Sequence, residues 1–494
     1  MGKYDKYFKL KVNEKVLKKT VERCKERGII LPTFAEQKNP KLIPQKIKDK
    51  LKSVGLWDIN PANLFRITWK NEPKQKGGQF GSVNYLEIPR ELTGVKARII
   101  GLVGKFFPTG AHKVGAAYGC LAPRLVTGEF DPTTQKAVWP STGNYCRGGA
   151  FDCALLACTA VAILPEEMSK ERFDWLKEIG AEVIATPGCE SNVKEIYDKC
   201  WEIRKTRKDC VIFNQFDEFG NAMWHYNITG SALEEVFNCE KTANSNLLAY
   251  ISATGSAGTL SAGDYLKNKF PVIKIFASEA LQCPTLLLNG WGGHRIEGIG
   301  DKHVPWIHNT RNTDGVVAID DENTMSLLRL FNEPNGHSFL IKELGLKKEL
   351  VEKLPLLGIS SICNLVSSIK VAKYYEASEN DIIFTVFTDS AEMYKSRLEE
   401  LTQKEGKYTE KAALADYSEY IKGLGIDYMA ELNYYDRKKL HNLKYYTWCE
   451  QQGKTSEELT MLWDPEFWNT MQHCVDEWDK YIKEFNKRTG LLKK

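Results

Sequence analysis

Short apolar runs alternate with amphipathic, helix-like stretches from about residue 80 to about residue 395. This alternation is typical of helices that cross between parallel strands, so it predicts an α/β fold. One crossing helix is expected over residues 170–179, because Ser169 is a suitable N-cap and Gly180 a suitable terminating residue. The runs that predict strands cover residues 97–103, 137–139, 161–164, 182–185, 211–213, 247–251, 272–277 and 382–387.

The two ends of the chain have other patterns. Residues 1–75 are rich in lysine, and their apolar residues are spaced loosely like one face of a helix, so we expect a solvated arm that packs on the core. Beyond about residue 400, apolar residues recur at three- or four-residue steps, which predicts a helix face that is apolar. These residues are Phe467, Met471, Cys474, Trp478, Ile482 and Phe485.

Local signals also favour helices in this last part. Asp464 followed by Pro465 is a good helix start, and Thr455 with Glu458 three residues later fits a capping box. We interpret the segment as a helical appendage that covers the core or forms a subunit contact. The predicted organisation is an arm (residues 1–75), a core (76–400) and a helical, aromatic-rich extension (401–494).

Composition excludes several classes of function. The net charge is +4, with 68 basic against 64 acidic residues, so the chain has no basic excess suited to nucleic acid. The N-terminal stretch has no apolar run of secretory or membrane-spanning length, and we expect a cytoplasmic protein with no membrane partner. The 13 cysteines include no Cys-x-x-Cys pair, which favours reduced core thiols. His303 and His308 are interpreted as structural, so no metal is expected.

Lys113 is the strongest chemical signal, because small and flexible residues surround this one amine in the run from Phe107 to Gly115. An amine placed against a carbonyl cofactor can form an imine. An isolated lysine is more often a solvated surface residue. The surrounding motifs decide between the two interpretations.

A loop of small residues follows the predicted strand at 247–251: Gly255, Ser256, Ala257, Gly258 and Thr259. Its backbone N–H groups could converge on a phosphate at a helix start, with hydroxyls as further donors. A tight turn or a nucleotide site would also fit this loop, although the pattern of a P-loop is absent.

A polar loop, Ser141 to Tyr145, follows the strand at 137–139. In open sheets, ligands bind where strands end and helices start. Its hydroxyls could hold a carboxylate, and the Asn144 amide could donate to a phenolic oxygen, although a capped helix start is the plain alternative. With Lys113, the glycine loop and the strand end Thr388-Asp389-Ser390, it outlines a pyridoxal phosphate site.

On these residues the chain resembles the cysteine synthase and cystathionine β-synthase family of fold type II pyridoxal-phosphate enzymes. The likeness spans roughly residues 80–395 and includes Asn214-Gln215-Phe216-Asp217 with Asn221, Glu297-Gly298-Ile299-Gly300 and Gly358-Ile359-Ser360-Ser361. It implies two open twisted sheets flanked by helices, a pyridoxal 5′-phosphate cofactor, a smaller mobile subdomain at about residues 110–215 of the catalytic core, and a homodimer.

The resemblance also implies a role for each matching residue. Lys113 would bind the cofactor covalently and take the substrate α-proton, and Ser390 would contact the pyridine nitrogen. The phosphate cup would be Gly255, Ser256, Ala257, Gly258 and Thr259. The substrate would be bound by Ser141, Thr142, Asn144, Tyr145 and Gly298, with Asn144 also on the cofactor phenolic oxygen.

Ser390 bears on the type of reaction. A hydroxyl is a neutral partner and cannot hold a protonated ring nitrogen as a carboxylate would, so the ring is a weaker electron sink. Loss of a β-leaving group to an aminoacrylate is then favoured over transamination. Asp389 is the competing residue, and this preference would reverse if Asp389 faced the ring. Neighbours in an extended stretch point in opposite directions.

Two departures from related sequences are informative. The motif Gly110-Ala111-His112-Lys113 resembles that of the tryptophan synthase β subunit. The glutamate expected upstream in that subunit is replaced near Gly104, so indole chemistry is not expected. Tyr145 and Cys146 stand where cysteine synthases carry Thr and Gly, which narrows the carboxylate pocket and leaves the amino acid undetermined.

The resulting hypothesis is a lyase or transferase of amino-acid metabolism, cysteine synthase-like. It would carry out β-replacement or β-elimination on serine, cysteine or an O-activated serine through an aminoacrylate, with sulfide or another small nucleophile. One alternative is an ammonia lyase of the serine/threonine dehydratase type. Another is a binding protein on a retired enzyme fold.

Overall fold

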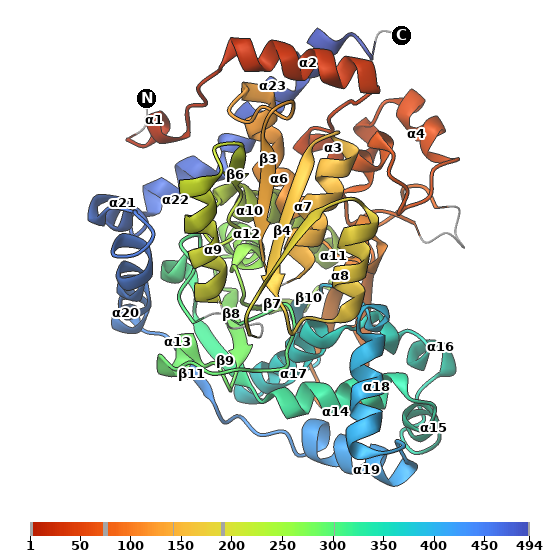
Figure 1. Ribbon diagram of the computed structural model, residues 1–494. Coiled ribbons are helices and arrows are strands. Elements are labelled where there is room, and N and C mark those ends of the chain that lie inside the picture. Colours follow the sequence, from red (N-terminus) through yellow and green to blue (C-terminus); the bar gives the residue numbers. More distant parts are fainter. Residues whose placement is uncertain (1–2, 73–77, 142, 189–192, 301, 493–494) are drawn as a thin grey trace.

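The computed structural model describes residues 3–72, 78–141, 143–188, 193–300 and 302–492, and its strands form two separate sheets (Figure 1). The smaller sheet has four parallel strands in the order β5-β4-β3-β6. The larger sheet has seven strands in the order β1-β2-β10-β7-β8-β9-β11. Its five central strands are parallel, and β1 and β11 pair antiparallel at the two edges.

The strands of the smaller sheet are β3 (Lys136–Pro140), β4 (Thr159–Pro165), β5 (Glu182–Thr186) and β6 (Cys210–Ile212). Those of the larger sheet are β1 (Tyr85–Ile88), β2 (Arg98–Val103), β7 (Asn246–Ala253), β8 (Lys274–Ala280), β9 (Gly315–Ile319), β10 (Asp381–Phe387) and β11 (Met429–Glu431). The expected α/β fold with two sheets is confirmed, and each of the eight predicted runs overlaps a strand. The run at 272–277 starts early, since Val272 is 75% exposed and β8 begins at Lys274.

Helices flank both sheets (Figure 1). Those before and around the smaller sheet are α1 (Asp5–Phe8), α2 (Glu14–Arg27), α3 (Phe34–Lys38), α4 (Gln45–Leu51), α5 (Arg90–Thr93), α6 (Lys113–Thr127), α7 (Asn144–Leu155), α8 (Lys170–Glu178), α9 (Val193–Thr206) and α10 (Phe219–Trp224). Those that follow along the chain are α11 (Gly230–Glu240), α12 (Ser261–Lys269), α13 (Thr285–Leu288), α14 (Asp321–Asn332), α15 (Pro334–Lys342), α16 (Lys348–Val351), α17 (Ile359–Tyr374), α18 (Lys395–Glu405), α19 (Glu410–Tyr417), α20 (Tyr434–Lys444), α21 (Ser456–Met461), α22 (Pro465–Gln472) and α23 (Cys474–Thr489).

Helix α8 matches the expected crossing helix in position but not in its cap. It ends one residue early, and Gly180 adopts the left-handed conformation (φ +82°) that a terminating glycine provides. The Ser169 hydroxyl stands at the N-cap but makes no capping bond, and its oxygen is buried without a hydrogen-bond partner among the described residues. The predicted cap is therefore wrong, although the helix itself is confirmed.

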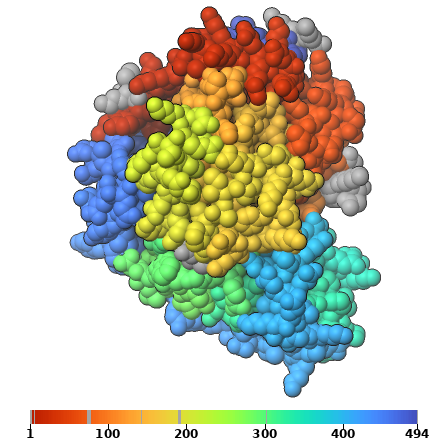
Figure 2. Space-filling view, in the orientation of Figure 1, coloured from red at the N-terminus to blue at the C-terminus, as the bar shows by residue number. Residues whose placement is uncertain are grey.

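The two ends of the chain pack on each other rather than lying free. The Asp479 carboxylate of α23 accepts the backbone N–H groups of Phe34 (2.7 Å) and Ala35 (3.0 Å) at the start of α3. Asn486 donates to the Leu31 carbonyl (2.8 Å) and accepts its N–H (3.0 Å). Figure 2 shows the N-terminal segment in red at the top of the molecule, with part of the blue C-terminal segment beside it.

The two helix-start signals predicted for residues 401–494 are confirmed, and the prediction of one apolar helix face is corrected. Thr455 and Glu458 form a capping box, and Asp464 accepts the Glu466 N–H at the start of α22. The six apolar residues predicted for one face are all buried, but they lie on two helices, α22 and α23. No single described helix is both long and apolar enough to cross a membrane. Only the bent pair Lys348–Leu356 and Ile359–Tyr374 (116°) meets both criteria, and α17 is almost entirely buried in the core.

Candidate active site

A cavity lies where strands of both sheets end. Its lining comes from the loops after β3, β7 and β10, from the start of α6 and from residues 298–300. The carboxyl ends of parallel strands are where ligands bind in open sheets. The lining residues include most of those named from the sequence: Lys113, Ser141, Asn144, Tyr145, Gly255, Ser256, Ala257, Thr259 and Gly298. Thr142 lies outside the described residues.

Lys113 is the first residue of α6, and its side chain is half-buried. Its Nζ donates to the Ser256 hydroxyl at 3.3 Å, which places the amine against the glycine loop. The small residues nearby are required by packing. A Cβ on Gly115 would lie 2.1 Å from the Trp224 ring, and one on Gly148 would lie 2.7 Å from the Val114 backbone. The start of α6 is therefore fixed between α7 and α10.

The loop after β7 is shaped to expose backbone donors. Ala257 has φ +63°, which turns the chain into the next helical segment. Among the described residues, the N–H groups of Gly255, Ser256 and Ala257 have no hydrogen-bond acceptor. The Ser256 hydroxyl also accepts from the Asn221 amide at 2.9 Å, and a Cβ on Gly258 would lie 2.1 Å from Asn221 Oδ1. Free N–H groups at a helix start form an anion site.

Across the cavity, the loop after β3 presents polar groups at the start of α7. The Ser141 hydroxyl accepts from the Gly143 N–H (3.1 Å) and from Gln215 Nε2 (3.2 Å). Asn144 is the first residue of α7, and its Nδ2 donates to Asp389 Oδ2 at 2.7 Å. Its Oδ1 is buried with no hydrogen-bond partner among the described residues. The Tyr145 ring packs edge-on against the Trp139 ring, with the two ring centroids 5.4 Å apart.

The three residues that follow β10, Thr388, Asp389 and Ser390, have different surroundings. Thr388 lines the cavity. The Asp389 carboxyl, completely buried, accepts from Asn144 and from the Tyr394 hydroxyl (2.7 Å), and burial raises its pKa above the ordinary value. Ser390 is not among the described lining residues, and its Oγ is buried with no hydrogen-bond partner among them. Neighbouring residues here do face different groups, as the extended sequence predicts.

The surroundings of Gly104 explain why the chain lacks the glutamate of the tryptophan synthase β subunit near this position. A Cβ at this position would lie 2.2 Å from the Thr388 carbonyl oxygen, far inside van der Waals contact. The backbone of the strand end therefore occupies the place of any side chain at residue 104. The glutamate of the tryptophan synthase pattern has no room here.

Several cavity residues had no assigned role in the sequence analysis. Gln215 lines the cavity, and Asn221 lies behind it and donates to the Ser256 hydroxyl; both stand within motifs that carried the resemblance, so a signal existed for them. Asn364 gave none. It lies on α17 and bridges two strands, accepting the Ala253 N–H (2.7 Å) and donating to the Val386 carbonyl (2.7 Å). Only the tertiary structure brings it to the cavity.

A histidine pair lies behind Lys113. His112 and His225 have ring centroids 4.9 Å apart, and burial lowers the pKa of both well below the ordinary value. His112 lines the cavity as a neutral ring. The other two histidines noted in the sequence are engaged elsewhere: His303 with the Tyr197 hydroxyl (2.8 Å) and His308 with the Thr313 hydroxyl (2.8 Å).

Buried ion pairs close the two sheet units around the cavity. Arg172 of α8 pairs with Glu297 Oε2 at 2.9 Å and donates to the Tyr394 hydroxyl at 3.1 Å. A Cβ on Gly143 would lie 2.4 Å from its guanidinium, so Arg172 also packs on the loop after β3. Arg397 binds the other Glu297 oxygen at 2.6 Å. One buried cluster thus joins the small-sheet unit to the larger sheet.

Comparison with known proteins identifies the family. Residues 104–338 match the family model described as "Pyridoxal-phosphate dependent enzyme". The cysteine synthase of Staphylococcus aureus is 31% identical over 290 residues, which is 58% of this chain and 84% of that relative. The chain belongs to the cysteine synthase family. The cystathionine β-synthase of Saccharomyces cerevisiae is 26% identical over 320 residues, covering 63% of this chain and 59% of that relative.

Solved structures agree on the fold of this cysteine synthase family member. The O-acetylserine-dependent cystathionine β-synthase of Helicobacter pylori matches with a TM-score of 0.52 and 23% identity, covering 63% of this chain and 94% of that one. The cysteine synthase of Entamoeba histolytica matches with a TM-score of 0.55 and 21% identity, covering 68% and 93%. The fold is that of the fold type II pyridoxal-phosphate enzymes.

The family cofactor, pyridoxal 5′-phosphate, suits the chemistry of the residues here. An amine faces a loop with three unengaged N–H groups, and a buried hydroxyl at Ser390 lacks a partner among the described residues. The cavity is narrow, with a volume of about 30 Å³. The Arg172 cluster holds the walls of this cavity together.

Proposed function

We propose that this protein is a pyridoxal-phosphate-dependent enzyme that replaces the β-substituent of serine, cysteine or an O-activated serine with sulfide or another small nucleophile. The main support is Lys113, whose amine stands against the glycine loop in a cavity lined by the residues of the family motif. The relatives named above, a cysteine synthase and a cystathionine β-synthase, support the reaction class.

The residues would hold the cofactor from several sides. Lys113 carries the covalent link, and Gly255, Ser256, Ala257, Gly258 and Thr259 hold the phosphate on N–H groups and hydroxyls. Asn144 Nδ2 has a second hydrogen, beyond the one given to Asp389, for the phenolic oxygen. Ser390 is the neutral partner of the ring nitrogen. Bound pyridoxal phosphate supplies an electron sink for the substrate α-carbon.

The substrate would lie on the side of the small sheet. Ser141, Thr142, Asn144 and the backbone at Tyr145 hold its carboxylate, and Gly298 leaves room for its side chain. The Lys113 amine would take the α-proton of the substrate and return it to the same carbon. A neutral partner at Ser390 keeps the sink weak, which favours loss of the β-substituent over transamination.

We further propose a cytoplasmic homodimer in which residues 110–215 form a mobile subdomain, residues 1–75 an arm and residues 401–494 a helical extension. Twelve cysteines in the described residues are free thiols, which suits a reducing compartment. Light scattering of the purified protein tests the dimer, and localisation of the tagged chain tests the compartment.

The reaction is tested by mixing the pyridoxal-phosphate-loaded protein with O-acetylserine and sulfide and measuring both cysteine and pyruvate. We expect cysteine. Pyruvate without cysteine would show an ammonia lyase instead. A cofactor spectrum that responds to no amino acid in a panel with serine and cysteine would contradict any enzyme of this class and would indicate a binding protein.

A further inference from the structure

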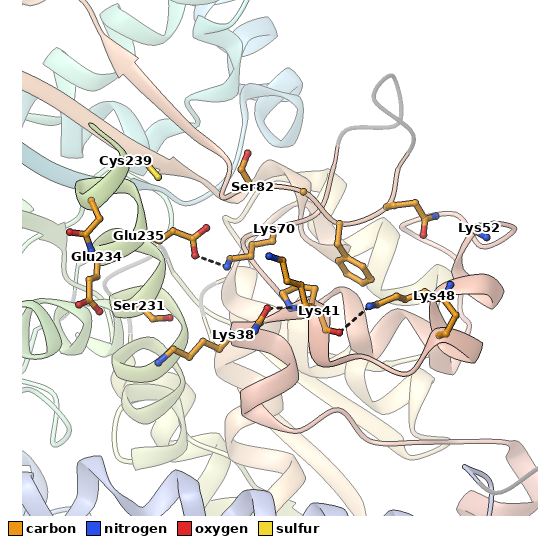
Figure 3. Close-up of a pocket in the computed structure, with 17 residues that line it drawn as sticks. Lys38, Lys41, Lys48, Lys52, Lys70, Ser82, Ser231, Glu234, Glu235 and Cys239 are labelled. Carbon is orange, nitrogen blue, oxygen red and sulfur yellow. Dashed lines mark hydrogen bonds and ion pairs between the residues drawn. The ribbon is translucent and has the colours of Figure 1, made fainter. Parts of the chain in front are cut away.

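A second cavity, of about 1060 Å³, lies between the N-terminal segment and α11 (Figure 3). Five lysines line it: Lys38, Lys41, Lys48, Lys52 and Lys70. Glu234 and Glu235 of α11 line it as well, and Figure 3 shows Lys70 beside Glu235, with Lys48 and Lys52 on the side away from α11. Among the described residues, it shares no lining residue with the active-site cavity.

The short helix α4 directs some of its lysines into this cavity and others away. Gln45, Lys48 and Lys52 line the cavity, and their spacing of three and four residues puts them on one face of the helix. Lys46 and Lys50 are exposed and are not among its described lining residues. Ile47 and Leu51 are buried, so they fix the rotation of α4 and keep the lining face in place.

The positive charge on this wall is only partly neutralised. Lys70 pairs with Glu235 at 2.6 Å, and Lys52 pairs with Asp49 at 2.7 Å. Glu234 accepts from the Tyr265 hydroxyl. Lys38, Lys41 and Lys48 form no ion pair with any described residue, and Lys48 Nζ donates instead to the Lys41 carbonyl at 3.2 Å. Unpaired cations of one sign in a concave wall raise the local concentration of anions.

We propose that this cavity binds a polyphosphate anion, either free or as the phosphate chain of a nucleotide. Lysine ammonium groups bind phosphate as point charges, and several of them suit a chain of phosphates better than a single one. The cavity volume lies just above the usual range for small-molecule sites, which leaves room for an anion of several phosphates. Phe80, Asn39 and Asn238 line the remaining wall and could contact a nucleoside.

The two glutamates limit where the anion lies. Glu235 holds Lys70 at the α11 side, so that side repels phosphate and the lysines of the N-terminal segment attract it. The anion would therefore contact Lys41 and Lys48, which form no ion pair with a described carboxylate, more closely than Lys38, whose Nζ lies 5.9 Å from the centre of the Tyr265 ring. This assignment does not depend on the reaction proposed for Lys113.

Calorimetric titration of the pyridoxal-phosphate-loaded protein with tripolyphosphate, ATP and adenosine tests the proposal. Loaded protein is used so that the cofactor already occupies its own phosphate cup. We expect tripolyphosphate to bind, and the double variant Lys41→Gln, Lys48→Gln to weaken it about tenfold or more. The matched control is Lys46→Gln, Lys50→Gln, which removes the same charge from outside the lining and should change binding less than about twofold.

The titrations also separate the two sources of phosphate. Equal affinity for tripolyphosphate and ATP would assign the site to the phosphate chain alone, whereas tighter binding of ATP would assign it to a nucleotide. Absence of binding by both at about 1 mM would overturn the proposal. Equal weakening by the lining and control variants would also overturn it, because the effect would then come from net charge.

Discussion

The two cavities of this protein place lysine in opposite settings. The active-site cavity is small and closed, and its Lys113 lies among buried hydroxyls and amides with fixed partners. The peripheral cavity is large, and its lysines lie at a surface where water screens their charges. The larger of the two cavities is therefore not the one that contains Lys113. Catalytic groups need fixed geometry and low dielectric, whereas recognition of an anion needs only summed charge.

The largest effect is expected where one lysine alone has a fixed geometry. Lys113→Ala should abolish the covalent link to pyridoxal phosphate and lower the rate of cysteine formation by about a thousandfold or more. Mass spectrometry after borohydride reduction measures the link, and a coupled assay measures the rate. Lys48→Ala, in the open cavity, is the control and should leave both unchanged. An adduct that survives in Lys113→Ala would place the link on another residue.

A second large effect is expected at the ion pairs that close the small cavity. Arg172→Met leaves Glu297 with one of its two arginine partners in a buried site, and we expect the free energy of unfolding to fall by about 3 kcal/mol. The cofactor should also exchange faster, since the walls separate more easily. Urea unfolding and the rate of pyridoxal phosphate release measure the two effects.

An exposed ion pair in the same unit provides the control for this variant. Lys194 and Asp198 pair on α9 with both side chains about 60% exposed, so Lys194→Met should cost less than about 1 kcal/mol. If Lys194→Met destabilises the protein as much as Arg172→Met, burial is not what gives the Arg172 cluster its strength.

The sequence predicted the parts of the fold and site that depend on local pattern. Parallel strands such as β4 and β10 are continuous apolar runs, and the glycine loop after β7 follows one of them. Three strands of the larger sheet were missed: the internal strand β9 and the two edge strands β1 and β11. The edge strand β11 has only three residues, which pair with β9 in the register Met429 to Val317, so its pairing is tertiary and leaves little local signal. The bond from Asn144 to Asp389 joins residues 245 positions apart, and no local signal marks it.

A smaller effect is expected from the carboxyl that holds Asn144. Asp389→Asn keeps one acceptor oxygen but removes the charge that orients the Asn144 amide, and we expect pyridoxal phosphate to bind about tenfold more weakly. Fluorescence titration of cofactor-free protein measures this affinity. A shift in the pH dependence of the cofactor absorbance should accompany it, because the donor to the phenolic oxygen becomes mobile.

Asp49 supplies the matched carboxyl at the open cavity, where it pairs with Lys52 and is exposed. Asp49→Asn should leave cofactor affinity unchanged and should slightly strengthen tripolyphosphate binding, since it frees one lysine. If Asp389→Asn leaves both cofactor affinity and the absorbance profile unchanged, Asp389 has a packing role only.

The last effect is absent at neutral pH and concerns a buried histidine. Burial, with the charge of Lys444, lowers the pKa of His308 from the ordinary 6.5 to about 3 in the folded protein. Between pH 3 and pH 6.5 the unfolded chain binds a proton at this imidazole that the folded protein does not bind. The contribution of His308 to the free energy of unfolding is therefore fully present above pH 6.5, and it falls as the pH decreases toward 3. His308→Gln should flatten this decrease by about 1.4 kcal/mol per pH unit. Urea unfolding at pH 7.0 and about pH 5 measures the slope, with exposed His473→Gln as the control. Equal slopes in wild type and His308→Gln would mean that the imidazole is protonated within the fold, which would require His308 to reach solvent or a carboxylate.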